Sequence, residues 1–391
     1  MNDKTPNIRF KGFTDDWEQR KFGDIGTVAM CKRIFKEQTS SEGDVPFYKI
    51  GTFGGEPDAF IDRELFKEYK SKFSYPNKGD ILLSASGTIG RTIEYTGNDE
   101  YFQDSNIVWL KHGDGIDNAF LEVLYSVVDW SCEGSTIKRL YNDNFLKTKF
   151  MMPKIEEQQK IGVYFKNLDH LITLHQRKYD QLLNIKKSML EKMFPKNGKK
   201  APEIRFVGFT DDWEQRKFGD IGTVAMCKRI FKEQTSSEGD VPFYKIGTFG
   251  GEPDAFIDRE LFKEYKSKFS YPNKGDILLS ASGTIGRTIE YTGNDEYFQD
   301  SNIVWLKHGD GIDNAFLEVL YSVVDWSCEG STIKRLYNDN FLKTKFMMPK
   351  IEEQQKIGVY FKNLDHLITL HQRKLEKLEN LKKSMLKQML L

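Results

Sequence analysis

Apolar residues recur in alternating steps of four and three from Ile155 to Met193, and charged or polar residues fill the positions between them. Residues three and four apart share one face of a helix, so this spacing predicts the apolar seam of a coiled coil. Roughly 38 helical residues at 1.5 Å each would form a rod of about 57 Å. The predicted seam positions are Ile161, Phe165, Leu168, Ile172, His175, Tyr179, Leu182, Ile185 and Met189.

The same stripe occurs twice, because the chain repeats itself at an offset of 196 residues. Gly12 through Lys178 is identical to Gly208 through Lys374, a block of 167 residues. A period this long differs from that of solenoid repeats, whose units run roughly 20–50 residues. Neither helix can bury its stripe alone, so we predict that the two pack on each other as a long antiparallel coiled coil. After Lys374 the letters change, but the stripe continues through Leu375, Leu378, Leu381, Met385 and Met389.

A globular segment precedes each helix, and its pattern is that of a mixed α/β (α+β) domain. Asp62 is placed to cap a short helix over 63–69, and Asp117 or Asn118 a second helix over 119–130. Strand and helix signals do not alternate as in a doubly wound sheet. The predicted strands are β-branched or aromatic runs between turn residues, over 45–50, 80–85, 92–95, 107–110 and 145–152.

These signals divide the chain into two copies of one recognition-type domain and two helices. We place the first domain at 1–153 and its helix at 154–194, and the second domain at 204–349 and its helix at 350–391. Residues 195–203 form a polar linker that is rich in lysine, glycine and proline.

Charge and cysteine content narrow the functional classes. Formal net charge is +0, but residues 1–150 carry 20 Lys and Arg against 24 Asp and Glu, whereas residues 151–203 carry 11 against 6. A nucleic-acid role would therefore depend on local basic patches. The chain shows neither a signal peptide nor an apolar run of eighteen residues, so we expect a cytoplasmic protein with no membrane contact. The spacing of Cys31, Cys132, Cys227 and Cys328 predicts buried thiols in place of disulfides or metal ligands.

Three motifs, each present twice, carry a resemblance to a known family. They are Arg9-Phe-Lys-Gly-Phe-Thr-Asp-Asp-Trp-Glu-Gln-Arg-Lys-Phe-Gly-Asp24, whose second copy has Val207 in place of Lys11, Gly79-Asp-Ile-Leu-Leu-Ser-Ala-Ser-Gly-Thr-Ile-Gly-Arg91 and Met152-Pro-Lys-Ile-Glu-Glu-Gln-Gln-Lys-Ile161. In this order the chain resembles the specificity (S) subunits of type I restriction–modification systems over essentially its whole length. Members usually carry two different recognition domains, whereas this chain carries the same one twice.

The resemblance implies a non-catalytic subunit that reads a bipartite target in double-stranded DNA. It also implies two DNA methyltransferase (M) subunits and restriction (R) subunits as partners. S-adenosylmethionine, ATP and Mg would belong to those partners, and this chain would hold no cofactor and no metal. With identical domains, we expect the two halves of the target to be palindromic.

Two basic loops and one glycine-rich turn are the candidate DNA contacts. Arg33 in the first loop could reach a guanine edge, and the turn after residue 85 could approach phosphates. Solvated charge and an ordinary glycine turn are the plainer alternatives. The candidates are Lys32, Arg33, Lys36, Ser86, Thr88, Arg91, Lys138 and Arg139, with their copies Lys228, Arg229, Lys232, Ser282, Thr284, Arg287, Lys334 and Arg335.

Two other functions remain open at the level of sequence. Asp58 with Glu68 and Lys70 matches the loose pattern of Mg-dependent nucleases, although a chain that is 30% charged produces such a pattern by chance. A coiled-coil scaffold that binds only protein is the other alternative. His175 and His371 on the seam are expected to fix helix register through hydrogen bonds.

Overall fold

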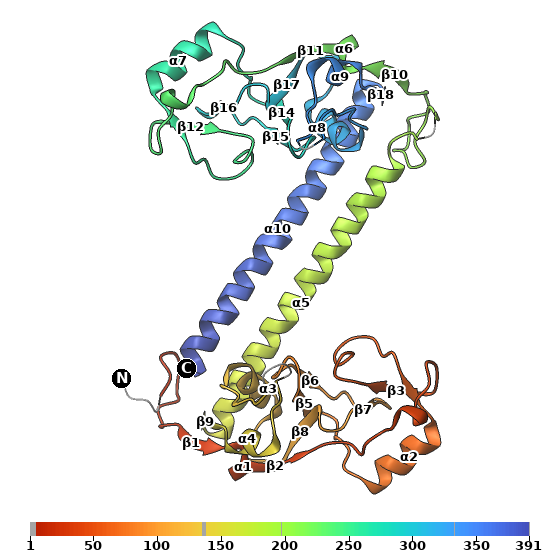
Figure 1. Cartoon of the computed structure of the whole chain (residues 1–391), viewed down its shortest axis with the longest axis vertical. Helices are drawn as coiled ribbons and strands as arrows, with labels where there is room; N and C mark the ends of the chain where they lie inside the picture. Colours follow the sequence, from red (N-terminus) through yellow and green to blue (C-terminus); the bar gives the residue numbers. More distant parts are fainter. Residues whose placement is uncertain (1–4, 135–137, 197, 332, 391) are drawn as a thin grey trace. The chain divides into compact units, whose positions relative to one another are not determined.

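The computed structural model describes residues 5–134, 138–196, 198–331 and 333–390. It divides into two compact units (Figure 1), one made of Met1–Gln176 with Arg373–Leu391, the other of Arg177–Gln372. Each unit contains one copy of the globular domain, the first part of one long helix and the last part of the other.

The element order is the same in both copies. The strands of the first are β1 Glu18–Lys21, β2 Gly26–Ala29, β3 Val45–Tyr48, β4 Phe60–Ile61, β5 Ile81–Ser84, β6 Thr92–Glu94, β7 Tyr101–Phe102, β8 Ile107–His112 and β9 Lys149–Met152. Its helices are α1 Phe22–Ile25, α2 Arg63–Lys72, α3 Asn118–Val127, α4 Asn142–Lys147 and α5 Ile155–Lys192, with a 3-10 turn, η1, at Lys36–Gln38.

The second copy repeats these elements with equivalent bounds. Its strands are β10 Glu214–Lys217, β11 Gly222–Ala225, β12 Val241–Tyr244, β13 Phe256–Ile257, β14 Ile277–Ser280, β15 Thr288–Glu290, β16 Tyr297–Phe298, β17 Ile303–His308 and β18 Lys345–Met348. Its helices are α6 Phe218–Ile221, α7 Arg259–Lys268, α8 Asn314–Val323, α9 Asn338–Lys343 and α10 Ile351–Leu390, with a 3-10 turn, η2, at Lys232–Gln234.

Most of the predicted strands and helices are present. The four predicted strands between residues 45 and 110 correspond to β3, β5, β6 and β8. Asp62 caps α2 by accepting from the Glu64 and Leu65 amides, and Asp117 caps α3 by accepting from the Phe120 amide. The expected strand over 145–152 was wrong in its first half, because residues 142–147 form α4 and Phe145 is buried from that helix.

An antiparallel sheet of order β2-β8-β5-β6 lies at the centre of the domain. Side chains alternate across a strand, so the sheet needs a core on each face when neither face meets water. On β8, Val108 and Leu110 join a core with α3 and α5, whereas Ile107 and Trp109 join a second core. The second core also contains the small sheet β4-β3-β7 and helix α2. The uninterrupted apolar runs of β5 and β8 follow from this two-sided burial.

Two polar side chains at the root of α5 attach the helix to the domain. Glu157 is buried and accepts from Arg9 Nε at 2.9 Å and Nη2 at 2.7 Å, and from Trp17 Nε1 at 3.1 Å. Gln158, also buried, accepts from the Asp117 amide at 2.9 Å and donates to the Pro153 carbonyl at 2.8 Å. The Glu-Glu-Gln-Gln motif therefore fixes the helix to the lead-in segment and to the start of α3.

The two long helices run in opposite directions within each unit. In the first unit Asp169 of α5 pairs with Lys382 of α10, and Met389 shares a core with Phe165, which lies one turn earlier on α5. In the second unit the roles are exchanged, and Asp365 of α10 pairs with Lys186 of α5. The antiparallel prediction is confirmed within each unit.

Two predicted seam positions were wrong. Ile185 is 40% exposed and its counterpart Leu381 is 44% exposed, whereas Leu182 and Met193 are buried. A straight helix has 3.6 residues per turn, so a strict 3.5-residue repeat gradually rotates around its surface. The buried face therefore shifts by one residue from the predicted position to Lys186, whose ammonium reaches Asp365.

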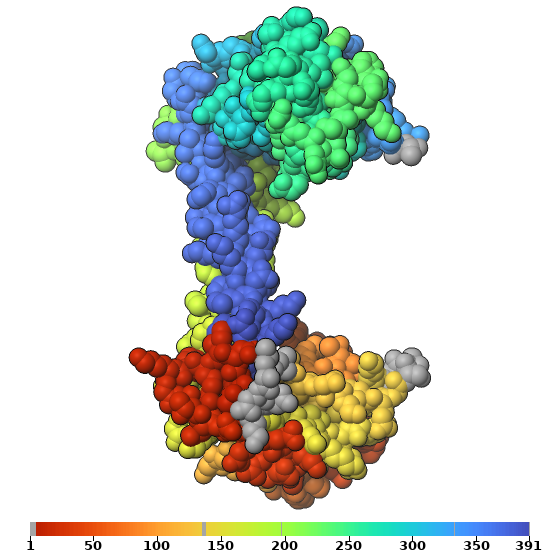
Figure 2. Space-filling view, turned by 90° about the vertical axis from the view of Figure 1, so that its left-hand side faces the viewer, coloured from red at the N-terminus to blue at the C-terminus, as the bar shows by residue number. Residues whose placement is uncertain are grey.

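The N-terminal segment of the first unit lies against the end of α10. The Ile8 amide donates to the Gln388 carbonyl at 3.0 Å, and Figure 2 shows the blue C-terminal end of this helix next to the red N-terminal segment. In the second unit the Ile204 amide donates to the Lys192 carbonyl at 2.9 Å. Phe194, just before the predicted linker, is buried and stacks on Phe316, so the chain leaves α5 through the domain core.

We predict that replacing Glu157 and its copy Glu353 by Gln destabilises the protein by about 3 kcal/mol per unit, because a nearly buried arginine loses its charge partner. Urea unfolding of the full chain measures the change. The adjacent exposed residues Glu156 and Glu352 provide the control, and their replacement by Gln should change stability by less than about 1 kcal/mol. Equal effects of the two double variants would contradict the anchoring role of Glu157.

A second prediction concerns the close approach of α5 to α3. A Cβ on Gly162 would lie 2.7 Å from both the Ala119 Cβ and the Phe120 amide nitrogen, and Gly358 is equivalent. Gly162→Ala with Gly358→Ala should therefore lower the melting temperature and destabilise each unit by about 1–3 kcal/mol, although alanine favours helix. Gly113→Ala with Gly309→Ala is the control, since a Cβ there meets nothing within 4 Å. A double Gly162/Gly358 variant as stable as the control would rule out this packing constraint.

Candidate nucleic-acid interface

Three loops of the domain meet at one edge of its central sheet. Strands β2 and β5 both pair antiparallel with β8, so each ends where β8 begins. The loop after β2 contains residues 30–36, the turn after β5 contains residues 85–91, and residues 103–106 lead into β8. The sheet thus collects the first basic loop and the glycine-rich turn, which are far apart in sequence. We call this surface the loop edge.

A fourth segment joins the loop edge through backbone hydrogen bonds. The Gly87 amide donates to the Lys138 carbonyl at 3.1 Å, and the Leu140 amide donates to the Ala85 carbonyl at 2.8 Å. These bonds place the exposed side chains of Lys138 and Arg139 beside the glycine-rich turn. A pocket of about 770 Å³ opens here, and its lining includes Met30, Ser105, Arg139, Tyr141, Asn142 and Asn144.

Arg33 is held at the loop edge by a carboxylate from another loop. Its Nε donates to Asp104 Oδ2 at 2.9 Å, and the side chain of Asp104 is 15% exposed while that of Arg33 is 59% exposed. The same carboxylate oxygen accepts from the Ser105 hydroxyl at 3.2 Å. Ser105 has φ of 59°, in the left-handed region that a non-glycine residue seldom adopts.

The other predicted contact residues differ in how free their side chains are. The Ser86 hydroxyl is buried and donates to Asn106 Oδ1 at 2.7 Å. Arg91 donates from Nη2 to the Ile50 carbonyl at 3.0 Å and lies over the Phe53 ring. Lys32 lies over the Phe73 ring, and Lys36 and Thr88 are exposed. The loop edge therefore brings together Arg33, Thr88, Lys138 and Arg139, whereas Ser86 and Arg91 make contacts within the protein.

The second copy has the same arrangement. Arg229 Nε donates to Asp300 Oδ2 at 2.9 Å, and Ser301 has φ of 59°. The backbone bond from Gly283 to Lys334 measures 3.0 Å. Arg287 again reaches the Ile246 carbonyl, and Ser282 is again buried; Lys228 lies over Phe269, while Lys232, Thr284 and Arg335 are exposed.

Sequence reasoning missed several residues of the loop edge. Tyr141, which is 48% exposed, and its neighbours Asn142 and Asn144 line the pocket. The run Tyr-Asn-Asp-Asn, rich in amide side chains, was a usable signal. The positions of Asp104 and Ser105 had no such signal, because their role depends on the loop that packs opposite them.

The residues of the nuclease-like pattern do not converge. Asp58 pairs with Lys49 at 2.8 Å, whereas Lys70 pairs with Asp99 at 3.5 Å and lies over the rings of Phe66 and Tyr75. Glu68 lies on α2, where it pairs with Lys72. Across the described residues, no group of three or more His, Cys, Asp or Glu side chains could hold a metal ion.

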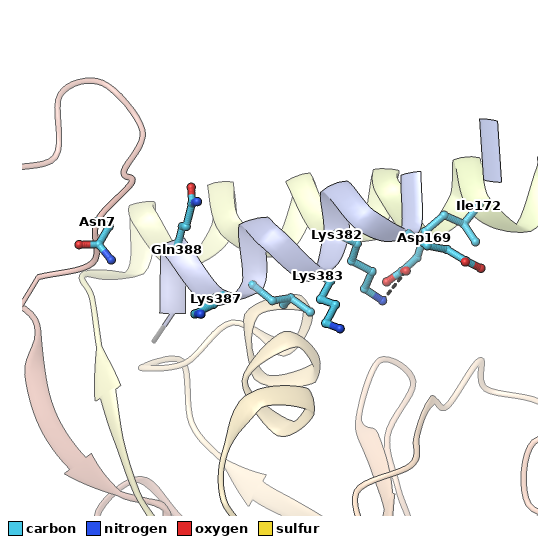
Figure 3. A pocket seen from close by; sticks show the side chains of 9 residues that line it. Asn7, Asp169, Ile172, Lys382, Lys383, Lys387 and Gln388 are labelled. Carbon is cyan, nitrogen blue, oxygen red and sulfur yellow. Dashed lines mark hydrogen bonds and ion pairs between the residues drawn. The ribbon is translucent and has the colours of Figure 1, made fainter. Parts of the chain in front are cut away.

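The helix pair of the first unit carries a separate pocket of about 900 Å³. Ile172 and Leu386 supply apolar surface, and Lys382, Lys383 and Lys387 supply positive charge. Figure 3 shows Lys382 directed at Asp169, with Lys383 and Lys387 one turn apart on α10. Asp169 and Glu379 also line this pocket, so its charge is mixed.

Each long helix also exposes apolar residues away from its partner. On α5 they are Val163, Leu171 and Leu174, between 44% and 57% exposed. At 100° per residue these three positions lie within about 80° of one another around the helix. Val359, Leu367 and Leu370 are the equivalent exposed residues of α10. We call each set an outer seam.

The described helices include none that is both long and apolar enough to cross a membrane. The cysteines also have defined environments, since Cys31 and Cys227 are buried and burial raises the pKa of each thiol to about 12. Cys132 and Cys328 are partly buried. All four are free thiols, but only Cys31 and Cys227 are buried as the sequence predicted.

Comparison with known proteins gives concordant matches. S.HindORF215P of Haemophilus influenzae is 57% identical over 143 residues, 36% of this chain and 37% of that protein, so the alignment spans little more than a third of this relative. The type I restriction enzyme MjaVIII specificity subunit of Methanocaldococcus jannaschii is 23% identical over 398 residues, covering 95% of this chain and 91% of its own.

The fold is similar to a solved structure as well. The crystal structure of the S subunit of a type I restriction-modification system from M. genitalium aligns over 99% of both chains, with a TM-score of 0.65 and 16% identity. The family model for the type I restriction modification DNA specificity domain matches residues 14–184 and again residues 210–380. Because that family model accounts for both copies of the repeat, the chain belongs to the family of type I restriction modification DNA specificity domains.

Proposed function

We propose that this chain is the sequence-reading subunit of a type I restriction–modification complex. Each recognition domain binds double-stranded DNA through its loop edge and reads one half of a bipartite target. The observation that carries the proposal is the loop edge itself, present in both copies of a chain that belongs to the specificity family.

The charge of the domain is consistent with reading bases more than with clamping the backbone. The first 150 residues carry more acidic than basic residues, so the domain lacks the broad positive surface that supplies non-specific affinity. At the loop edge, arginine, asparagine and tyrosine side chains surround one pocket. Arginine and asparagine are the side chains that read guanine and adenine in the major groove.

The remaining affinity and all of the chemistry come from partner subunits in this proposal. Two methyltransferase subunits dock on the outer seams of α5 and α10, and restriction subunits join the complex so formed. S-adenosylmethionine, ATP and Mg²⁺ are bound by those partners, because this chain has neither a phosphate-binding P-loop nor convergent acidic residues in its described part. The chain itself is non-catalytic and works where the DNA is, in the cytoplasm.

The test is to co-express the chain with its methyltransferase and to map the methylated bases on the host DNA. We expect methylation in one bipartite sequence motif that depends on this chain. Methylation with no sequence preference, or none in the presence of a folded complex, would overturn the proposal.

The identity of the two domains generates a prediction about that motif. Equivalent ion pairs occur in the two units with the roles of α5 and α10 exchanged, so each copy contacts the helix pair in the same way. Each domain should then read the same bases on opposite strands, so the second half-site is the reverse complement of the first. Methylation mapping tests this prediction. A motif with two unrelated halves would contradict the expected reverse-complement symmetry.

A further prediction addresses the outer seams. Leu174→Glu with Leu370→Glu places a carboxylate in each proposed contact and should weaken methyltransferase binding roughly tenfold or more, since an unpaired charge is costly in an interface. Calorimetric titration of the purified chain with the methyltransferase measures this. The exposed residues Thr173 and Thr369, when changed to Glu, provide the matched control and should bind as the wild type does. Unchanged binding of the leucine variant would exclude the seams as the docking surface.

A further inference from the structure

We propose that Arg33 and its copy Arg229 each read a guanine, and that Asp104 and Asp300 are the positioning residues that aim them. This inference rests on the proposed function and extends it by naming a base and the side chain that recognises it. It predicts a G·C pair at the same place in both half-sites.

The geometry of the Arg33 guanidinium favours contact with a base. Asp104 accepts from Nε of Arg33 at 2.9 Å, which fixes the plane of the group from its inner side. Within the described part of the chain, the two terminal nitrogens of Arg33 have no hydrogen-bond acceptor. Those two nitrogens form a planar fork of N–H donors, and this fork matches the O6 and N7 acceptors on the major-groove edge of guanine.

Arg33 differs from other arginines of the domain in which of its nitrogens are already bonded. Arg9 donates twice to the buried Glu157, and Arg91 reaches a backbone carbonyl with its terminal nitrogen. Arg20 and Arg63 form ion pairs through a terminal nitrogen, with Glu18 and Asp99. Among the described arginines, only Arg33 and its copy Arg229 combine a fixed Nε with an unpaired fork at the loop edge.

The ion pair with Asp104 favours base reading over phosphate binding. An arginine paired with a carboxylate carries less effective positive charge, so its attraction for a phosphate and the release of counterions are both reduced. The same carboxylate limits the orientations of the side chain and lowers the entropy lost when the fork binds a base. The arrangement thus weakens the sequence-independent contact and strengthens the specific one.

The backbone next to the Asp104 carboxylate also has an unusual conformation. Ser105 adopts φ of 59°, and both Ser105 and its copy Ser301 donate a hydroxyl to the preceding aspartate. A left-handed non-glycine residue is unfavourable by about 1 kcal/mol or more, and such residues are found chiefly where function fixes the backbone. The unfavourable backbone conformation of Ser105 positions Asp104, and Asp104 in turn positions Arg33.

The experiment uses the full chain in complex with its methyltransferase and the target duplex identified by methylation mapping of the wild type. First, each guanine of the half-sites is replaced in turn by 7-deazaguanine, which lacks the N7 acceptor. We expect one position per half-site to weaken wild-type binding several-fold. The variant Arg33→Lys with Arg229→Lys, which keeps the charge and loses the fork, should be insensitive to the replacement at that position.

Second, the lysine variant is assayed on duplexes with single base-pair changes. Discrimination at the one G·C pair should fall roughly 10- to 100-fold, and all other positions should keep their preference. Asp104→Asn with Asp300→Asn should reduce discrimination at the same pair to a smaller extent. Arg20→Lys with Arg216→Lys changes an exposed, ion-paired arginine elsewhere and should leave every position unchanged.

The results of these experiments distinguish failure of the guanine assignment from failure of the proposed function. A wild-type complex that methylates no specific sequence would overturn the function as a whole. Specific methylation of a half-site without any G·C pair would overturn the guanine assignment alone. So would a lysine variant that binds all sequences more weakly by the same factor with a smaller salt dependence, because that is the behaviour of a phosphate contact.

Discussion

The structure depends on a buried carboxylate. Glu157 is buried at the root of α5. A carboxylate can be buried only when charge-assisted hydrogen bonds replace its hydration. Arg9 and Trp17 of the lead-in segment supply those bonds, and Gln158 supplies further bonds to the backbone beside α3 and β9. Glu157 and Gln158 therefore fix helix, lead-in and recognition domain in one geometry at the root of α5. An apolar contact could contribute similar stability, but it would not impose the same direction on the helix.

The two units share this geometry, yet their helix ends differ in chemistry. Glu379 and Lys387 of the pocket on the first unit correspond to Leu183 and Glu191 in the second. Trp213 also differs from its copy Trp17, since its indole nitrogen is buried without a hydrogen-bond partner in the described structure. The two recognition domains are identical, but the helix surfaces beside them are not. A partner can therefore distinguish the two helix surfaces.

Much of this fold could be predicted from the sequence, because its signals are local or periodic. The cap residues Asp62 and Asp117 and the four strands between residues 45 and 110 needed only nearby residues. The exposure of Ile185 could not be seen, because small differences in helix winding accumulate along the seam. The loop edge was predicted in part. Basic residues pointed to Arg33 and Arg139, but the burial of Ser86 and the pairing of Arg33 with Asp104 arise from strands that meet only in the fold.

The position of the loops also bears on how such proteins evolve. The loop edge lies where β2 and β5 end and β8 begins, whereas both cores lie on the faces of the sheet. Exposed side chains there, such as Thr88, Arg139 and Tyr141, can be exchanged without opening a cavity in either core. A few substitutions in these loops can then change what the surface binds while both cores stay packed, and duplication carries the change into both copies at once.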